Sequence, residues 1–302
     1  MTYTTAIVTA EPRGAYHLAP LADALGDTSD LVHLLPYPEP VQGHPPTDTT
    51  SDLDVLADVG RLVVTGGSWS AWTAAVAWRA HHLDLEVRFL GIAHSAPRPP
   101  FRAPAVARAA ARSLAEAAPI ASMHQLPVGQ IVITGTPQLD NVPTWTPDGS
   151  VLCVSTTDLD RRDPGFGLLA AARTLAERGV KVRVRTHPRE DASVWDGFEV
   201  VGRDVPATTC AAMSSAVLAY PGSVLPTLAA SGPPVVVYTP TAELRALLDS
   251  SWAPAAARTT ERVTDLIDAA LSCAPVAAET LEVLVGPRGG SAARIVAFIR
   301  NS

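Results

Sequence analysis

The sequence has few cysteines, few aromatic residues and no long apolar run. Its three cysteines lie far apart and include no CxxC pair, which excludes a zinc ribbon and a disulfide framework; they are Cys153, Cys210 and Cys273. Apolar residues surround all three, so we expect buried free thiols. No stretch reaches the roughly 18 consecutive apolar residues of a transmembrane helix, so we expect no membrane span.

An excess of basic residues is also missing. The sequence has 23 Lys and Arg against 30 Asp and Glu, and its formal net charge of −7 argues against nucleic acid as a partner, because such binding needs a broad basic face. The first residues lack both the basic start and the apolar core of a signal peptide. We therefore expect a cytoplasmic, reducing location. The richness in Ala, Arg and Pro is typical of a bacterial genome rich in GC.

Several widespread catalytic and cofactor motifs are absent. The sequence contains no GxxxxGK[ST] loop, no GxGxxG after a strand, no GxSxG elbow and no HExxH. These absences exclude a P-loop, the usual dinucleotide fingerprint, a serine-hydrolase elbow and a zinc-protease site. We expect neither a metal site nor a cofactor.

Short apolar runs that alternate with helical stretches dominate what is present. Runs such as 61–64 and 151–154 are followed at once by Thr or Ser, which is typical of parallel βαβ units. The polar, proline-rich stretch 141–150 separates two such series and indicates a linker. The sequence thus predicts an α/β protein with two Rossmann-like domains whose parallel sheets face a cleft. The domains span 1–143 and 148–286, and a C-terminal helix, 287–302, could pack back on the first domain.

One part of the first domain is rich in alanine. Because alanine has the highest helix propensity, we expect a helix over about 103–118. Two short apolar runs follow, and they predict strands over 119–124 and 130–134.

Candidate site residues in the first domain follow predicted strands, where open parallel sheets bind ligands. Gly14 permits a close approach of a ligand, and His17 would lie near a helix start, where the neutral imidazole is favoured and can take a proton from a hydroxyl. A histidine that only packs at the turn is the alternative. The remaining acceptor-side candidates are backbone donors and a loop histidine, or else an ordinary tight turn: Gly66, Gly67, Ser68 and His94.

Candidate site residues in the second domain are mostly cationic or small. The segment RTHPRE places Arg185, His187 and Arg189 directly after a strand, and the arginine fork fits phosphate oxygens, although a solvated charge run would look the same. Gly222 and Ser223 precede a helix and predict a phosphate site or a simple N-cap.

A further pair of candidates follows the first strand of the second domain. Hydroxyl and guanidinium groups at Thr156 and Arg162 could reach a diphosphate, or could belong to an ordinary turn.

Together the motifs resemble those of the GT-B glycosyltransferase superfamily. ITGTPQLD, which ends at Asp140, is similar to a VTGNPxxD segment before the interdomain linker. RTHPRE, 185–190, is similar to a KxHPRE segment of CDP-glycerol transferases and capsule polymerases. AYPGSVLPTLAASGPPVVV, 219–237, resembles a donor-binding segment, and GAYHLAPLADAL, 14–25, resembles the opening of the transferase that forms lipid II. UDP-N-acetylglucosamine 2-epimerases are related to the same superfamily.

The resemblance implies a role for individual residues. It implies that Gly222 and Ser223 meet the donor phosphates, that His187 and Arg189 face the diphosphate or the sugar, and that His17 is the base or an acceptor contact. Glu11, six residues before His17, is the second residue predicted to take part in catalysis. Thr227 stands where the family often has a glutamate that grips the ribose hydroxyls. One hydroxyl cannot accept both hydrogen bonds, which favours a CDP- or CMP-linked donor or a nucleotide held by backbone groups.

The predicted function is therefore that of a metal-independent glycosyltransferase. Its partners would be a nucleotide-activated sugar and an acceptor hydroxyl whose identity the sequence leaves open, and a homodimer is allowed. An epimerase or hydrolase of nucleotide sugars is one alternative hypothesis. A non-catalytic binding protein of GT-B type is another, motivated by Thr227 and by the few carboxylates near the predicted site.

Overall fold

The computed structural model describes residues 4–9, 21–35, 48–66, 69–91, 102–156, 162–187, 190–202, 205–222, 224–249 and 257–301. The chain divides into two compact units. The first comprises Met1–Asp140 and Val285–Ser302, and the second comprises Asn141–Leu284. The last helix of the chain thus belongs to the first unit.

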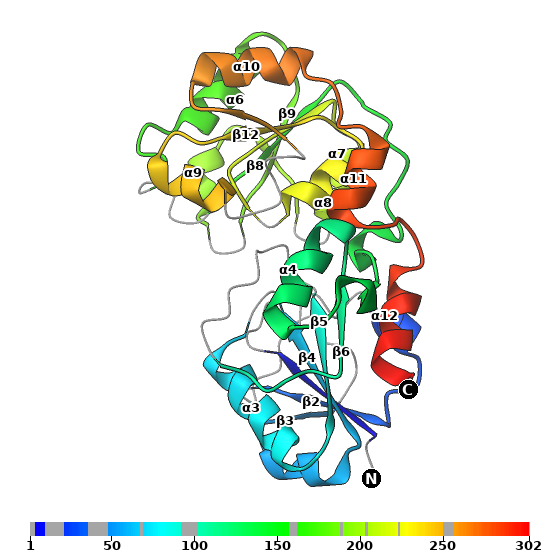
Figure 1. Cartoon of the computed structure of the whole chain (residues 1–302). Helices are drawn as coiled ribbons and strands as arrows, with labels where there is room; N and C mark the ends of the chain where they lie inside the picture. The colour runs from blue at the N-terminus through cyan, green and yellow to red at the C-terminus, as the bar shows by residue number, and fades with distance from the viewer. Residues whose placement is uncertain are drawn as a thin grey trace. The chain divides into compact units, whose positions relative to one another are not determined.

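The first unit contains a parallel sheet of seven strands in the order β3-β2-β1-β4-β5-β6-β7 (Figure 1). All six neighbouring pairs are parallel. The strands are β1 (Thr5–Thr9), β2 (Leu31–Leu34), β3 (Asp48–Thr50), β4 (Arg61–Gly66), β5 (Glu86–Gly91), β6 (Arg108–Ala111) and β7 (Ile131–Ile133). This order places a switch point, where the connections change direction along the sheet, between β1 and β4.

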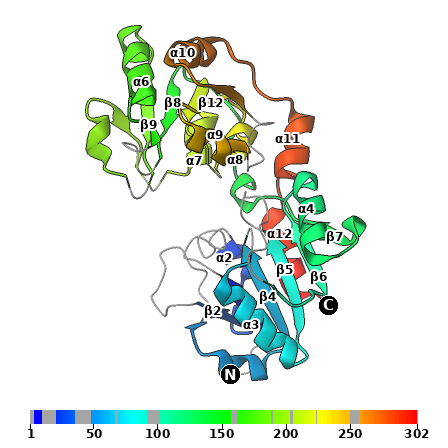
Figure 2. The ribbon, with the colours of Figure 1, turned by 60° about the vertical axis from the view of Figure 1, so that its left-hand side comes forward.

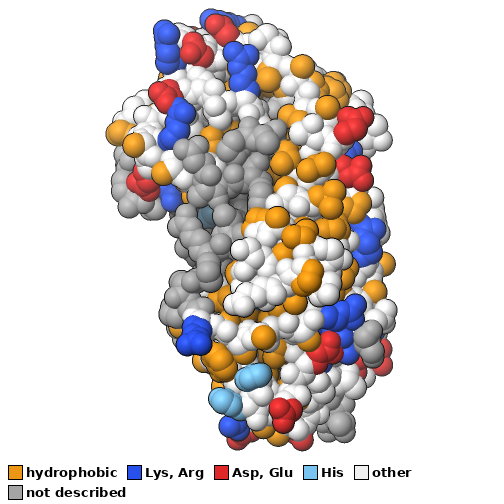
Figure 3. All heavy atoms as spheres, viewed as in Figure 1, with side chains coloured by type: hydrophobic (Ala, Val, Ile, Leu, Met, Phe, Trp, Pro, Cys, Tyr) orange, Lys and Arg blue, Asp and Glu red, His pale blue; other side chains and the backbone are white. Residues whose placement is uncertain are grey.

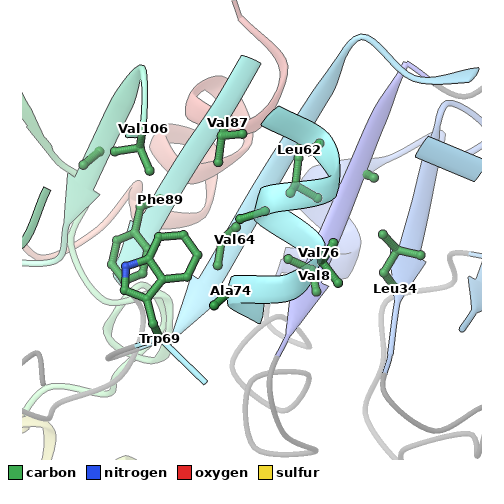
Figure 4. Packing of buried hydrophobic residues seen from close by; sticks show 14 of the residues in the cluster. Val8, Leu34, Leu62, Val64, Trp69, Ala74, Val76, Val87, Phe89 and Val106 are labelled. Carbon is green, nitrogen blue, oxygen red and sulfur yellow. The ribbon is translucent and has the colours of Figure 1, made fainter. Parts of the chain in front are cut away.

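Both faces of this sheet are covered. The helices are α2 (Ala22–Leu25), α3 (Ala71–His82), α4 (Leu114–His124) and α12 (Ser291–Arg300), and the 3-10 turns are η2 (Leu53–Asp58), η3 (Val128–Gln130) and η4 (Pro137–Leu139). On one face, Val8, Val64 and Phe89 pack with residues of α3 and with Trp69 (Figure 4). On the other face, Ile7 and Val63 pack with residues of α2 and α12. Neighbouring residues of one strand therefore serve opposite cores, as the two-residue repeat of a strand requires.

Helix α12 is held at both of its ends by side chains of the first unit. Its first backbone N–H groups, those of Ser291 and Ala292, donate to the Asp140 carboxylate at 2.9 and 2.8 Å. At the other end, Arg88 donates to the carbonyls of Phe298 and Asn301. The negative charge thus meets the positive end of the helix and the positive charge meets its negative end, and both contacts stabilise the helix.

The guanidinium of Arg88 lies in the interior, since the side chain is 0% exposed. Its charge is balanced by Glu86, at 2.7 Å from Nε, and the same carboxylate binds Nε of Arg61 at 2.8 Å. Arg61 in turn donates to the carbonyls of Ile299 and Arg300. Two guanidinium groups, both paired with one carboxylate, thus donate to the last carbonyls of α12.

A close backbone contact marks the point where the chain re-enters the first unit. Gly286, with a φ of 93°, lies so near the carbonyl of Arg112 and the Cα of Gly135 that a Cβ would overlap them. The Arg112 side chain is buried in an ion pair with Glu116. This position therefore requires glycine.

The second unit contains a parallel sheet of six strands in the order β10-β9-β8-β11-β12-β13. All five neighbouring pairs are parallel. The strands are β8 (Val151–Val154), β9 (Val182–Arg185), β10 (Glu199–Val200), β11 (Ala216–Ala219), β12 (Val235–Tyr238) and β13 (Arg258–Thr260). Numbered within the unit, this is the order 3-2-1-4-5-6 of a Rossmann sheet.

Helices also cover the sheet of the second unit. They are α6 (Gly167–Glu177), α7 (Ala207–Ala212), α8 (Leu225–Ala230), α9 (Ala242–Asp249), α10 (Val263–Ser272) and α11 (Ala278–Val285), with the turn η5 (Ala192–Trp195). Helices α6 and α10 contact each other and pack on one face, and α7 and α8 lie on the other (Figure 2). Residues 145–148 of the predicted linker are part of the second unit: Trp145 Nε1 donates to the carbonyl of Ser214, and its ring packs on Gly232.

The fold-class prediction is confirmed, since both sheets are parallel and flanked by helices, but several elements differ. Residues 108–111 of the predicted alanine-rich helix form β6, and helix α4 occupies the predicted strand 119–124. The alanines of β6 are fully buried between β5 and β7, where small side chains fit, so packing overrides helix propensity. Strands β3 and β13 are short and mostly exposed, and the apolar pattern did not reveal them.

The cysteines follow the sequence prediction in part. Cys153 and Cys210 are buried free thiols, and burial raises the pKa of Cys153 to about 12. Cys273 is only half-buried, which corrects the expectation of three buried thiols, because it follows the last turn of α10.

His124 lies in an aromatic cluster of the first unit. Its ring centroid is 4.4 Å from that of Phe89 and 5.7 Å from that of Trp69. The histidine is 8% exposed, and Nε2 has no hydrogen-bond partner among the described residues. Burial lowers its pKa from 6.5 to about 4.

We expect the ion pair of Arg88 and Glu86 beside α12 to contribute more to the free energy of unfolding than an exposed ion pair does. Replacing Arg88 by Met removes one of the two guanidinium partners of Glu86 and the donor to two carbonyls at the end of α12, and should lower the free energy of unfolding by about 3 kcal/mol. The matched control is Arg79→Met, because Arg79 is half-exposed and lies 3.7 Å from Asp54; it should cost less than about 1 kcal/mol. Urea unfolding measures both, and equal losses would contradict a structural role of Arg88.

The buried histidine predicts a loss of stability in acid. Between its unfolded pKa of 6.5 and its folded pKa of about 4, only the unfolded chain takes up the proton, so stability falls as the pH falls through this range. The full loss is up to about 3 kcal/mol. His124→Phe keeps an aromatic ring and removes the proton site. The free energy of unfolding, measured in urea between pH 7 and pH 4, should depend less on pH in this variant than in the wild type. An equal dependence in both proteins would show that His124 is not the group responsible.

Candidate functional site

The switch point of the second unit lies between β8 and β11, and ligands of open parallel sheets bind there, beyond the carboxyl ends of the strands. Ser155 and Thr156 follow β8 directly, and Tyr220 to Gly222 follow β11. The segment 186–190 follows the neighbouring strand β9. The structure thus brings the predicted residues Thr156, His187 and Gly222 to one edge of one sheet.

The most distinctive feature of this edge is Arg162, which hydrogen bonds hold in place. Nη1 of Arg162 donates to Oγ1 of Thr156 at 3.0 Å, and the Arg162 carbonyl accepts from Oγ1 of Thr241 at 3.3 Å, beyond the end of β12. Nε of Arg162 is buried and has no hydrogen-bond partner among the residues that the structure describes. A buried N–H without a partner is uncommon and marks a position where an acceptor is needed.

A carboxylate joins the segments after β8 and β9. Oε1 of Glu190 accepts from Oγ of Ser155 at 2.5 Å and from Nε1 of Trp195 at 3.0 Å. Oε2 accepts from the backbone N–H of His187 at 3.1 Å, and the N–H of Glu190 donates to the His187 carbonyl at 2.9 Å. Glu190 therefore binds both backbone polar groups of His187, its N–H and its carbonyl, and holds the residue in place.

A second carboxylate lies on the other side of the β8 segment. Oδ2 of Asp163 accepts from the hydroxyl of Tyr220 at 2.5 Å and from the N–H of Leu168, at the start of α6, at 3.4 Å. Asp163 is 2% exposed and Tyr220 is 3% exposed. Burial raises the pKa of Tyr220, and the neighbouring carboxylate raises it further. Asp163 thus ties the segment after β8 to the end of β11.

The other predicted donor-side residues have different surroundings. Nη1 of Arg185, at the end of β9, donates to the carbonyls of Gly202 and Val205, so this group stabilises the segment after β10. Thr227 is buried in α8, where its carbonyl accepts from Oγ of Ser231 at 3.0 Å. Arg189 and Ser223 lie outside the described residues.

The acceptor-side predictions fall mostly outside the described part of the chain. Gly66 ends β4, at the switch point of the first unit, and its φ of 154° is one that other residues rarely adopt. Glu11, Gly14, His17, Gly67, Ser68 and His94 lie outside the described residues, so their predicted roles stay predictions.

Three residues of this edge were missed by the sequence analysis. Glu190 closes the RTHPRE segment, so the motif itself contained the signal. Asp163 precedes a Pro-Gly pair before a helix, which is a weak sign of a capping carboxylate. Tyr220 gave no signal, because a tyrosine at the end of a buried strand is usual in a core.

Charge is distributed without a dominant sign on the face shown in Figure 3, where basic and acidic side chains are interspersed. No helix among the described residues is long and apolar enough to cross a membrane. The same residues contain no group of three or more His, Cys, Asp or Glu side chains arranged to hold a metal ion.

Neither a protein-family model nor a curated protein matches the sequence. Solved structures do match. The spinosyn rhamnosyltransferase SpnG aligns at 14% identity with a TM-score of 0.66, covering 99% of this chain and 100% of that chain. Staphylococcus aureus MnaA in a co-structure with UDP aligns at 14% identity and a TM-score of 0.62, covering 99% and 96%. The wall teichoic acid polymerase TagF, soaked with CDPG, aligns at 10% identity and a TM-score of 0.61, covering 98% and 87%.

These similarities and the two parallel sheets define the class: the chain has the GT-B fold. The predicted resemblance is thereby confirmed at the level of the fold. The structural neighbours are enzymes and include both UDP-N-acetylglucosamine 2-epimerases and glycosyltransferases. Because one fold serves several reactions, the fold by itself does not choose between them.

The buried pair of Asp163 and Tyr220 generates a prediction about the candidate site. Tyr220→Phe removes a hydrogen bond to a buried carboxylate and should lower the free energy of unfolding by about 2 kcal/mol, as measured in urea. Tyr238→Phe is the control, because the Tyr238 hydroxyl makes no hydrogen bond to the described residues and its loss should cost less. If the control loses as much stability as Tyr220→Phe, the hydrogen bond is not the cause.

Proposed function

We propose that the chain is a glycosyltransferase that moves a sugar, or a related group, from a nucleotide-activated donor to an acceptor hydroxyl without a metal ion. The second unit would bind the donor and the first unit would bind the acceptor. A cytoplasmic location and a homodimer stay predictions.

The main support for the proposal is the guanidinium of Arg162, which Thr156 holds in place. It lies in the segment after β8, beside a switch point, with Nη1 held by Thr156 and a buried Nε that lacks a partner among the described residues. Guanidinium groups bind phosphate oxygens through two parallel N–H donors. Holding the group in place before the ligand arrives lowers the entropy cost of binding.

The same groups suit the departure of a nucleoside diphosphate. Negative charge develops on the phosphate oxygens as the glycosidic bond to the donor breaks, and a preorganised cation stabilises that charge most when it need not reorient. His187 and the backbone around Gly222 would add donors. Arg162 would supply the positive charge that a metal ion supplies in other transferases. His17 would take the proton of the acceptor hydroxyl.

Thr227 bears on the choice of nucleotide. A threonine hydroxyl accepts fewer hydrogen bonds than a carboxylate, so we expect weak recognition of the ribose hydroxyls by α8. A CDP- or CMP-linked donor therefore remains as good a candidate as a UDP-linked one.

An epimerase is the second candidate, favoured by the fold shared with UDP-N-acetylglucosamine 2-epimerases. Epimerisation needs groups that remove and return a proton on a sugar carbon. Asp140, the carboxylate that ends the segment ITGTPQLD, caps α12 and is not free for that role. Incubation with UDP-N-acetylglucosamine alone separates the hypotheses, because only an epimerase or a hydrolase forms product without an acceptor.

We expect Arg162→Ala to weaken nucleotide binding. UDP, CDP and TDP are first tested for a shift in melting temperature, and the nucleotide that shifts it most is titrated by calorimetry. Loss of charge-assisted hydrogen bonds of about 1.5–3 kcal/mol should raise its Kd at least about tenfold.

Arg173→Ala is the matched control, because Arg173 is an exposed arginine of α6 in the same unit and should leave the Kd unchanged. Equal Kd values for Arg162→Ala and the wild type would remove Arg162 from the site. If none of the three nucleotides shifts the melting temperature of the wild type, the protein is not a nucleotide-dependent enzyme of this kind.

A further inference from the structure

Glu190 occupies a central place at the candidate site without being one of its expected ligand contacts. Three donors converge on its carboxylate: Oγ of Ser155, Nε1 of Trp195 and the backbone N–H of His187. All three donors are neutral, so the carboxylate does not serve to neutralise any of them. Its contacts instead connect three separate segments of the second unit.

One of these contacts leads into the core. Trp195 is 0% exposed and packs in the main hydrophobic cluster of the second unit, with Phe198 at a ring distance of 6.1 Å. Its indole N–H holds Oε1 of Glu190 at 3.0 Å. Glu190 is thus anchored to a rigid part of the domain, because buried aromatic rings have little freedom to move.

The other two contacts lead to the ligand side. Ser155 immediately precedes Thr156, whose hydroxyl orients Arg162, and His187 follows β9 at the same edge of the sheet. Each segment follows a strand by only one or two residues, and such loops need support from other side chains to keep a fixed conformation. One carboxylate supports both.

We propose that Glu190 is a positioning residue: it transmits the rigidity of the Trp195 core to His187 and to the segment 155–156, so that both meet the donor diphosphate in one fixed geometry. This inference rests on the proposed function of the same site. Glu190 itself does not touch the diphosphate, because both of its oxygens already accept hydrogen bonds from the protein.

Glutamine is the informative substitution. Its side chain has one acceptor oxygen and one amide nitrogen that only donates. If the oxygen faces Ser155 and Trp195, the nitrogen opposes the N–H of His187. In the flipped orientation the bond to the indole N–H of Trp195 is lost, and the Ser155 hydroxyl has to accept instead of donate. Glu190→Gln therefore breaks at least one of the connections while keeping the size of the side chain.

The experiment is a double-mutant cycle of Glu190→Gln with His187→Ala, with UDP as the probe. The readouts are the Kd for UDP from calorimetry and the melting temperature without ligand. We expect Glu190→Gln to raise the Kd about tenfold, but to change it only about threefold when His187 is already replaced. Residues that act through one another are not additive, while the effect on the segment 155–156 persists. Glu199→Gln, an exposed glutamate paired with Lys181 at 2.9 Å, is the control and should bind UDP as the wild type does.

Two outcomes would overturn the inference. If Glu190→Gln lowers only the melting temperature and leaves the Kd unchanged, Glu190 is purely structural. If the effects of the two substitutions on the Kd add fully, Glu190 does not act through His187. If Glu190→Gln does not fold, Ser155→Ala takes its place and should weaken UDP binding less than His187→Ala does. If the wild type binds none of UDP, CDP and TDP, the proposed function is wrong. If the wild type binds UDP and Glu190→Gln has the same Kd, only the role of Glu190 is wrong.

Discussion

Parallel strands whose two faces are both covered impose the main constraint on this protein. Residues such as Ile7 and Val8 point into different cores, and the strands β8, β11 and β12 are buried along their whole length. A polar side chain inside such a strand would lose its hydrogen bonds to water. Polar groups are therefore concentrated just beyond the strand ends, and the switch point gathers those of the second unit around Thr156 and Tyr220.

Several charged side chains that enter the interior are closely paired. Arg88 meets Glu86 and the last carbonyls of α12, Arg112 meets Glu116, and Asp163 meets Tyr220. In the first unit these contacts hold a helix that comes from the far end of the chain. In the second unit they hold segments at the candidate site. The same physical rule, that a buried charge needs partners, thus serves architecture in one unit and the proposed chemistry in the other.

The fold is shared with enzymes of different reactions, so function depends on individual side chains. A cation held by a neighbouring hydroxyl, a histidine whose backbone is fixed from two directions and a glycine beyond β11 together make an edge suited to phosphate oxygens. The supporting carboxylates are already bound by protein donors, and this favours a role in orientation over one in proton transfer. The proposed transfer from a nucleotide donor uses these groups in their present positions.

The sequence by itself determined the α/β class and the two series of βαβ units, because apolar period and turn chemistry are local properties. It also predicted the strand ends as the place of a candidate site, with Thr156, Arg162, His187 and Gly222 among the candidates. Only the tertiary structure decided that the alanines of β6 form a strand, that Arg185 supports the segment after β10, and that Glu190 and Asp163 join neighbouring segments. These features depend on contacts between residues far apart in the sequence, such as Ser155 with Glu190 and Asp163 with Tyr220. Local patterns contain no information about such partners, since packing and hydrogen-bond pairing are settled only when the strands are placed in their order.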